Sequence, residues 1–280
     1  MLVSFTKMHG LGNDFMVLDQ VTSPVQLTAQ QIQQLADRHF GVGFDQLLLV
    51  EPPASADVDF NYRIYNADGI EVEHCGNGAR CFARYVHDNG LTTSNPIRVK
   101  TVNRVLELIL EEDGQVTVDM GRPSFDPADI PLKAAHPAPL YQRRVTVGGI
   151  GHDLEFSALS MGNPHAVLVV DDVDSFPVGP VGSALGSHAD FPEGVNVGFM
   201  ELQDRNRVKL RVYERGAGET LACGTGACAA VAAGCHRGLL DGKVTLQLRG
   251  GELTVSWQQG DSPILMTGPA TTVFQGRLEL

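Results

Sequence analysis

Short hydrophobic runs recur along the whole chain, and turn-forming residues separate them. Five runs predict β-strands, because each is rich in β-branched or other apolar residues and is bounded by polar positions. They are QLLLVE at 46–51, VLELIL at 105–110, VTVDM at 116–120, HAVLVVD at 165–171 and VKLRVYE at 208–214. Their spread over both halves of the chain indicates a protein built largely from β-sheet.

Two Ala-containing stretches, 76–88 and 224–237, predict helices instead. Each begins in the phrase Cys-Gly-X-Gly-Ala, written CGNGA at 75–79 and CGTGA at 223–227. Strands combined with one such helix in each half predict an α+β fold in which a helix packs inside a sheet twice.

The segment 122–139, RPSFDPADIPLKAAHPAP, separates the two halves. Its five prolines are incompatible with a helix or a central strand. We therefore expect a linker here, with one domain ending at residue 121 and the next beginning at residue 122.

The two halves also share short sequences in the same order, at offsets of 150 or 148 residues. Matching order at nearly constant spacing predicts a duplicated unit with pseudo-two-fold symmetry. The corresponding positions are Gly12-Asn13 and Gly162-Asn163, Asp45-Gln46 and Val195-Asn196, Tyr65-Asn66 and Tyr213-Glu214, and Cys75 and Cys223.

The composition narrows the possible partners. The net charge is −12 at pH 7 and no Lys/Arg cluster offsets it, so neither nucleic acid nor a membrane surface is expected as a partner. The start of the chain, MLVSFTKMHG, has the pattern of neither a signal peptide nor a transit peptide. Five cysteines without a CxxC pair argue against a disulfide framework and a zinc site. We therefore expect reduced thiols, a cytoplasmic protein and no metal.

The Cys-Gly phrases carry the candidate chemistry. At a helix start, the positive end of the helix dipole stabilises a thiolate and lowers a cysteine pKa toward neutral. The backbone N–H groups of the first turn form a site for a carboxylate. Two such helix ends facing each other would hold one carboxylate between two sulfurs. One thiolate would remove the α-proton while the opposite thiol delivers another, which inverts the stereocentre without pyridoxal or any other cofactor. Cys81, Cys228 and Cys235 lack this setting and are assigned to the core.

The chain resembles the diaminopimelate epimerases, the cofactor-independent two-cysteine racemases of lysine and peptidoglycan biosynthesis. The resemblance implies two similar domains, each a barrel-like, mostly antiparallel sheet around a central helix, with the active site in the cleft between them. It also implies that 269–280 returns to the first domain, which gives domains of 1–121 plus 269–280 and of 122–268. The matching stretches span nearly the whole chain and are MHGLGNDF (8–15), GVGFDQ (41–46), YNADG (65–69), CGNGARC (75–81), MGNPHAV (161–167), GVNVGF (194–199), YERGAGET (213–220) and ACGTGACA (222–229).

The activity that the resemblance implies is epimerisation of LL-2,6-diaminopimelate to the meso isomer, with Cys75 and Cys223 as the acid/base pair. The second amino-acid end of this substrate needs a carboxylate and amide oxygens for its ammonium and a guanidinium for its carboxylate. The residues expected to bind substrate are Asn13, Gln46, Asn66, Gly76, Asn77, Asn163, Asn196, Glu214, Arg215, Gly224 and Thr225.

Three further residues have expected roles. His165 and Glu214 are expected to tune the thiols, since an imidazole near a sulfur favours its thiolate or relays its proton. The stretch TTVFQGRLEL (271–280) alternates like an edge strand, and the resemblance places it in a homodimer contact. Phe274 stands there where tyrosine is common in the family. The expected partners are therefore an amino-acid substrate and a second copy of the chain.

Two alternatives stay open at this point. A proline or hydroxyproline racemase of the same fold would share both thiols but bind a compact ring, so YERGAGET favours diaminopimelate. Isomerases of this fold that lack the cysteine pair are disfavoured because both thiols are present. The other class is a non-catalytic amino-acid-binding or thiol redox protein, in which Cys75 and Cys223 would form a disulfide on oxidation.

Overall fold

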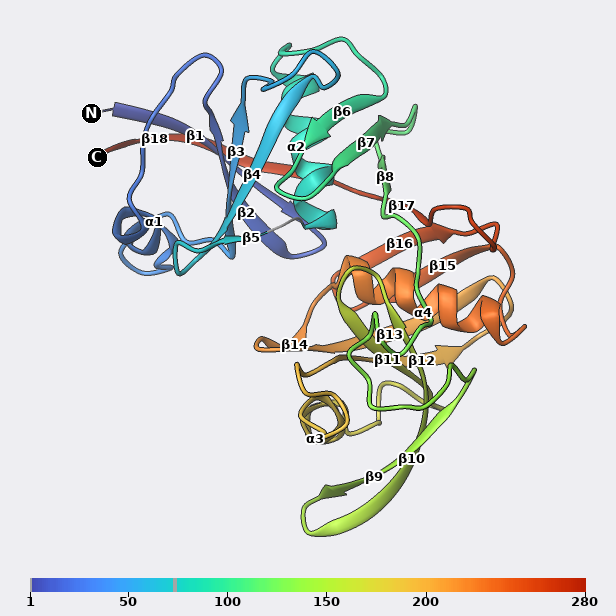
Figure 1. The fold of residues 1–280 in the computed structure, drawn as a ribbon. Coiled ribbons are helices and arrows are strands. Elements are labelled where there is room, and N and C mark those ends of the chain that lie inside the picture. The colour runs from blue at the N-terminus through green and yellow to red at the C-terminus, as the bar shows by residue number, and fades with distance from the viewer. Residues whose placement is uncertain (1, 73–74) are drawn as a thin grey trace. The chain divides into compact units, whose positions relative to one another are not determined.

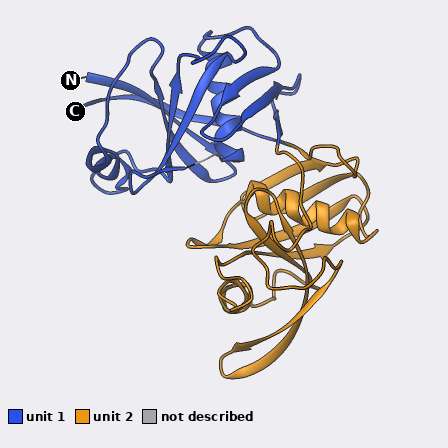
Figure 2. Ribbon diagram, viewed as in Figure 1, with its two compact units in different colours: residues 1–119, 267–280 blue, residues 120–266 orange. Residues whose placement is uncertain are grey.

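The computed structural model describes residues 2–72 and 75–280. The chain divides into two compact units (Figure 2), unit 1 with residues 1–119 and 267–280 and unit 2 with residues 120–266. Both boundaries fall two residues before those drawn from the sequence. None of the helices in the described residues is long and apolar enough to cross a membrane.

Unit 1 is a curved, mostly antiparallel sheet. Its strands pair in the order β18–β1–β2–β3–β4–β6–β7–β8, with parallel pairing at β2–β3 and β4–β6. The short strand β5 adds to β4, and β17, whose first two residues belong to unit 2, pairs with β8. The bounds are β1 Leu2–Gly10, β2 Asn13–Asp19, β3 Gln46–Glu51, β4 Phe60–Asn66, β5 Glu71–Val72, β6 Ile97–Lys100, β7 Val105–Leu110, β8 Val116–Asp119, β17 Leu265–Gly268 and β18 Thr271–Glu279.

Unit 2 repeats this plan. Its strands pair in the order β9–β10–β11–β12–β13–β15–β16, again with parallel pairing at two places, β11–β12 and β13–β15. The short strand β14 adds to β13 as β5 adds to β4. The bounds are β9 Tyr141–Val147, β10 Ile150–Ser160, β11 Pro164–Val169, β12 Asn196–Leu202, β13 Arg207–Glu214, β14 Gly218–Thr220, β15 Lys243–Leu248 and β16 Gly251–Ser256.

Each sheet surrounds one buried helix (Figure 1), α2 (Gly76–Asp88) in unit 1 and α4 (Gly224–His236) in unit 2. Helix α2 contacts β1, β2, β3, β7 and β8, and α4 contacts β10–β13 and β16. Their first turns are rich in Gly and Ala, and α4 continues with small side chains, so a sheet closes tightly around each helix. The predicted α+β class is confirmed, and both helices begin at the predicted residue.

The strand register repeats as well. In the parallel pair β2–β3, Phe15 lies opposite Gln46, and in β11–β12, His165 lies opposite Asn196, 150 residues later. The strands predicted at 46–51 and 105–110 match β3 and β7, and the other three differ by one or two residues at an end.

Two features differ from the sequence prediction. Each unit has a second helix, α1 (Ala29–Ala36) and α3 (Val178–Gly186), where the sequence predicted one helix per half. The proline-rich segment 122–139 has no helix or regular strand, but it is not a free linker. Ile130 and Leu132 are buried in the core of unit 2, because the segment supplies apolar side chains that cover the sheet. Ser124 also forms a backbone bridge with Ser160.

Candidate active site

Cys75 and Cys223 occupy the same position in the two units. Each is the N-cap residue of the buried helix, with extended backbone at φ −136° and φ −123°. The first hydrogen bonds of the helices run from Ala79 N to Cys75 O (2.8 Å) and from Ala227 N to Cys223 O (2.9 Å). The N–H groups of residues 76–78 and 224–226 therefore belong to first turns, where the helix itself supplies no acceptor.

In unit 1, Asn13 lies beside Cys75. The preceding Gly12 has φ +88°, a conformation that favours glycine, and it turns the chain from β1 into β2 at this point. Cys75 Sγ donates to Asn13 Oδ1 at 3.4 Å, and Asn77 Nδ2 donates to the same oxygen at 3.3 Å. The structure thus brings three of the predicted site residues into direct contact.

Gln46 and Asn66 form a second contact in unit 1. They lie opposite each other at the ends of β3 and β4, and Gln46 Nε2 donates to Asn66 Oδ1 at 2.9 Å. The other end of the amide, Gln46 Oε1, is buried and has no hydrogen-bond partner among the described residues. A buried acceptor in this state favours a ligand that brings a donor.

In unit 2, Asn163 takes the place of Asn13, again after a glycine with positive φ, Gly162 at +89°. Asn163 Nδ2 donates to Thr225 Oγ1 at 3.3 Å, and its Oδ1 lies 2.9 Å from His165 Nε2. Cys223 Sγ lies 3.6 Å from Thr225 Oγ1 and accepts from Gly226 N at 3.4 Å. His165 is therefore connected to the sulfur through Asn163 and Thr225.

His165 is neutral in this setting. It is 1% exposed, and burial, with a smaller effect of Arg215, lowers its pKa to about 3. A neutral imidazole does not stabilise a thiolate by charge, and the expected role of His165 in tuning the thiol stays a prediction. The contact that the structure gives this ring is the positioning of Asn163.

The pKa of Cys223 departs from the expected direction. Burial raises the pKa of this thiol well above its usual value, and the nearby Glu214 raises it further, whereas the hydrogen bonds from Thr225 and Gly226 act in the opposite sense. Burial therefore acts on this thiol in the direction opposite to the helix-end effect that the sequence predicted. Glu214 itself accepts a hydrogen bond from Thr220 Oγ1 at 2.5 Å.

Asn196 and Arg215 lie next to each other, but their exposure differs. Asn196 is 4% exposed, accepts from the backbone N of Arg215 at 2.9 Å and donates to Pro164 O at 3.1 Å. Arg215 has an exposed side chain, and its Nη1 donates to Glu193 O at 2.7 Å. Both groups of the Asn196 amide are thus used inside unit 2, where they fix the backbone that presents Arg215.

Three side chains in contact with these groups were missed by the sequence reasoning. Asp45 accepts from Asn13, Arg80 donates to Asn77, and Thr220 donates to Glu214. Asp45 and Arg80 stand inside the matched phrases GVGFDQ and CGNGARC, and Thr220 ends YERGAGET. Their place in these phrases was the available signal.

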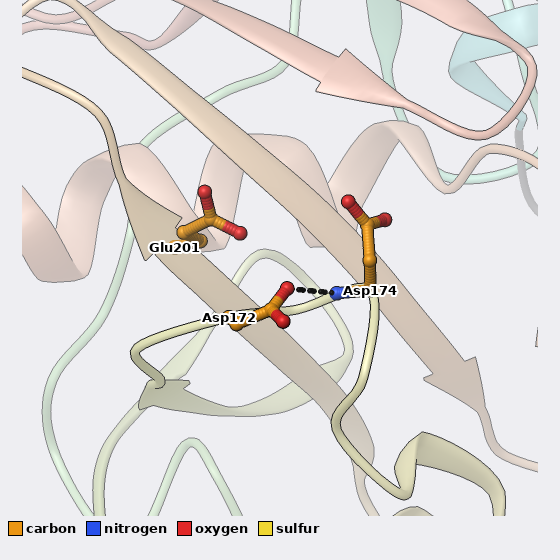
Figure 3. Close-up of side chains that lie close together, drawn as sticks. All are labelled: Asp172, Asp174 and Glu201. Atoms are coloured by element: carbon orange, nitrogen blue, oxygen red, sulfur yellow. Dashed lines mark hydrogen bonds between the residues drawn. The ribbon is translucent and has the colours of Figure 1, made fainter.

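An acidic group lies elsewhere in unit 2 (Figure 3). Asp172, Asp174 and Glu201 bring carboxylate oxygens within 4.8 Å of one another, the geometry of a possible cation site among the described residues. Lys209 already pairs with Asp174 at 2.9 Å and with Glu201 at 3.6 Å. Asp172 caps its own loop by accepting from Asp174 N and Ser175 Oγ. These contacts account for the group without a metal.

A cavity of about 910 Å³ lies in unit 1, between α1 and the strands β3 and β4. Leu27, Ile32, Leu49 and Tyr65 are among its lining residues, and none of the predicted site residues lines it. The cavity is therefore separate from the cysteine site.

Comparison with known proteins identifies close relatives. The sequence profile of the family described as diaminopimelate epimerase matches residues 5–125 and 157–273. The diaminopimelate epimerase of Laribacter hongkongensis is 57% identical over 282 residues, covering 100% of both chains. That of Cupriavidus necator is 56% identical over 283 residues, covering 100% of this chain and 98% of the relative.

Solved structures show the same fold at much lower identity. A hydroxyproline epimerase from Agrobacterium vitis, solved with bound trans-4-hydroxy-L-proline, has a TM-score of 0.69 at 16% identity and covers 99% of this chain and 92% of its own. A PhzF-family protein of Bacillus anthracis has the same TM-score and identity with full coverage of both chains. The fold is thus shared with proteins of other families, whereas the sequence over its whole length follows one family. The chain belongs to the diaminopimelate epimerase family.

Proposed function

We propose that the protein interconverts LL- and meso-2,6-diaminopimelate, with Cys75 and Cys223 exchanging the α-proton from opposite faces. The observation that carries the proposal is the duplicated placement of the two thiols. Each caps a buried helix, and its surroundings include an asparagine that follows a left-handed glycine. The relatives at 56–57% identity are named for this activity, which belongs to lysine and peptidoglycan biosynthesis.

The proposed mechanism uses the two helix starts together. The substrate carboxylate at the reacting centre accepts from first-turn N–H groups of Gly76 and Asn77 and of Gly224 and Thr225. Fixed N–H dipoles stabilise the negative charge that develops on this carboxylate as the α-proton leaves. One cysteine acts as the thiolate base and the other as the thiol acid. The configuration at the α-carbon is therefore inverted, and after turnover the two cysteines have exchanged their protonation states. The proposed mechanism needs no pyridoxal cofactor.

The distal amino-acid end is proposed to bind the polar groups around both half-sites. Glu214 and Gln46 Oε1, which has no hydrogen-bond partner in the described part of the chain, are acceptors suited to an ammonium group, and the exposed guanidinium of Arg215 suits a carboxylate. A substrate ammonium near Cys223 would also offset the effect of Glu214 on the thiol. Asn66, Asn163 and Asn196 complete the proposed binding set.

We further propose a homodimer and a cytoplasmic location. Phe274 is 47% exposed on the edge strand β18 and packs edge-to-face on Phe5, with ring centroids 6.0 Å apart. The adjacent Val273 is 55% exposed and adds apolar area beside Phe274, which favours contact with a second copy. All five cysteines are free thiols, as is usual in a reducing compartment.

The first test is proton NMR in D₂O with LL-diaminopimelate. The expected result is deuterium at one α-carbon together with meso product, lost in both Cys75→Ala and Cys223→Ala. Cys228→Ala is the matched control, because this buried thiol lies one turn into α4 and is expected to leave turnover intact. If L-proline exchanged its α-proton for deuterium while diaminopimelate stayed unchanged, the substrate assignment would be contradicted. No exchange with either compound would favour a binding or redox role.

A further inference from the structure

The hydrogen bonds around Asn13 have a fixed direction, and an ionised side chain sets it. Asn13 Nδ2 donates to Asp45 Oδ2 at 3.1 Å. An ionised carboxylate accepts hydrogen bonds and donates none. The NH₂ group of Asn13, and not its carbonyl oxygen, must therefore face Asp45.

A second ionised side chain, that of Arg80, fixes the orientation of the neighbouring Asn77 amide. Arg80 Nη2 donates to Asn77 Oδ1 at 2.9 Å, and a guanidinium donates but does not accept. The NH₂ group of Asn77 consequently faces Asn13 and donates to its Oδ1 at 3.3 Å. Arg80 is 0% exposed, so solvent does not compete for its contact with Asn77.

The consequence falls on Cys75. With its NH₂ group on Asp45, Asn13 presents Oδ1 to the sulfur at 3.4 Å. An oxygen acceptor at this distance stabilises the protonated thiol and disfavours the thiolate. These hydrogen bonds run from Arg80 through Asn77 and Asn13 to Asp45. Their direction is set at one end by the guanidinium, which only donates, and at the other by the carboxylate, which only accepts.

Unit 2 provides an internal comparison. Its equivalent of Asn13, Asn163, is turned the other way, with Oδ1 toward His165 and Nδ2 toward Thr225. Its equivalent of Asp45 is Val195, which offers no side-chain acceptor. The same asparagine thus takes opposite orientations in the two units, and its anchoring partner differs accordingly.

We propose that Asp45 is a positioning residue of the epimerase, which orients the Asn13 amide so that its oxygen holds Cys75 as a thiol before substrate binds. This inference rests on the proposed function, since it gives Cys75 a proton to exchange. Asp45 is itself fixed, because its carboxylate also accepts from Asp14 N at 3.1 Å and from Arg38 Nη2 at 2.8 Å.

Among the described residues, two further titratable groups near Cys75, Tyr62 and Cys81, stay uncharged over the pH range of the test. Tyr62 donates to Cys75 O at 3.4 Å, and burial, with the nearby thiols, raises its pKa well above the usual value. Burial likewise raises the pKa of Cys81 to about 12. The charged side chains linked to Asn13 are Asp45, Arg38, Asp14 and Lys7 on one side and Arg80, through Asn77, on the other.

The test is the alkylation rate of Cys75 by iodoacetamide between pH 6 and 9.5 in the intact protein, measured at peptide level by mass spectrometry. In Asp45→Ala the Asn13 amide loses its carboxylate acceptor and keeps only the 3.3 Å contact from Asn77, so Nδ2 can turn toward the sulfur and stabilise its thiolate. The pH at half-maximal rate is expected to fall by about 0.5 to 1 unit, since a hydrogen bond to the charged form favours it. Asp45→Asn keeps the shape of the side chain, but a single carbonyl oxygen then replaces the two carboxylate oxygens that accept from Asn13, Asp14 N and Arg38. This variant is also expected to lower the pH at half-maximal rate.

A double-mutant comparison separates orientation from charge. Removing a negative charge also favours the thiolate, but that effect does not need Asn13, so Asp45→Ala is made in an Asn13→Ala background too. The proposal requires that the shift nearly vanish there, and that Arg38→Gln, which keeps the Asp45 acceptor, not lower the half-maximal pH. No shift in the single variants, or an equal shift without Asn13, would overturn it. The native protein's failure to turn over diaminopimelate would instead overturn the proposed function, which this measurement does not use.

Discussion

Arg211 donates two hydrogen bonds to Glu219 across β13 and β14, at 2.7 and 2.9 Å. Arg63 makes the same pair with Glu71 across β4 and β5, at 2.8 and 2.9 Å, 148 residues earlier. In each unit the acid lies four residues before the N-cap cysteine. The duplicated ion pair therefore fastens the short strand that leads into each catalytic helix.

Replacing Arg211 with Met is expected to destabilise unit 2. Both side chains are 19% exposed, and the change leaves Glu219 with Arg249 as its cationic partner. Because the pair is partly buried, the expected loss in the free energy of unfolding lies between the losses for surface and buried ion pairs, at about 1 to 2 kcal/mol. Urea unfolding measures it. Arg144→Met is the control, because Arg144 and Asp153 pair at 69% and 76% exposure, and an equal loss there would contradict the argument.

The stability of unit 2 is expected to fall as the pH drops below 6.5. His165 has a pKa of about 3 in the folded unit and near 6.5 when unfolded, so between these values the unfolded state binds the additional proton. Each pH unit in this window removes up to about 1.4 kcal/mol. Unfolding at pH 7, 5.5 and 4.5 measures the slope, and His165→Gln is expected to flatten it. An unchanged slope in that variant would assign the effect to other groups.

A methyl group at Gly78 is expected to displace the start of α2. An added Cβ would lie 2.4 Å from Tyr62 Oη, closer than packed atoms allow. Gly78→Ala is expected to cost roughly 1 to 3 kcal/mol, as overpacking does, and to lower turnover because the helix start moves. Gly179→Ala is the matched control, since nothing lies within 4 Å of its added Cβ. Tyr62→Phe, which removes the clashing oxygen, is expected to restore part of the stability of Gly78→Ala.

Phe274→Glu is expected to dissociate the proposed homodimer. The change puts a charge into the exposed apolar area of β18 while leaving the backbone pairing with β1 in place. Sedimentation velocity is expected to show a dimer for the native protein and a monomer for the variant. Phe40→Glu changes a residue that is 94% exposed elsewhere in unit 1 and is expected to keep the native assembly state. Native protein that sediments as a monomer would refute the dimer.

The sequence prediction found the two catalytic helices and missed α1 and α3, for different reasons. The start of α1 was readable, because Thr28 and Gln31 form a capping box. Helix α3, VGPVGSALG, contains three glycines and a proline and has weak intrinsic propensity. Burial of Val181 and Leu185 against the sheet stabilises it, and that packing is not visible in a local pattern.

The contacts of the candidate site were likewise predictable from the sequence only in part. The repeat and the family phrases pointed to Asn13, Cys75 and Asn77, which the structure places in contact. The contact of Asp45 with Asn13 depends on the parallel pairing of β2 with β3, which spacing alone does not set. The burial that raises the pKa of Cys223 is a property of the assembled unit, which local reasoning about the helix start does not show.

The pairing of β1 with β18, Leu2 opposite Glu279, has a consequence for biosynthesis. Unit 2 is encoded without interruption between the two segments of unit 1. During translation, all of unit 2 leaves the ribosome before β18 does, and domains generally fold as units while the chain is made. The half-site of Cys223 can thus form while the sheet that carries Cys75 still lacks its last strand.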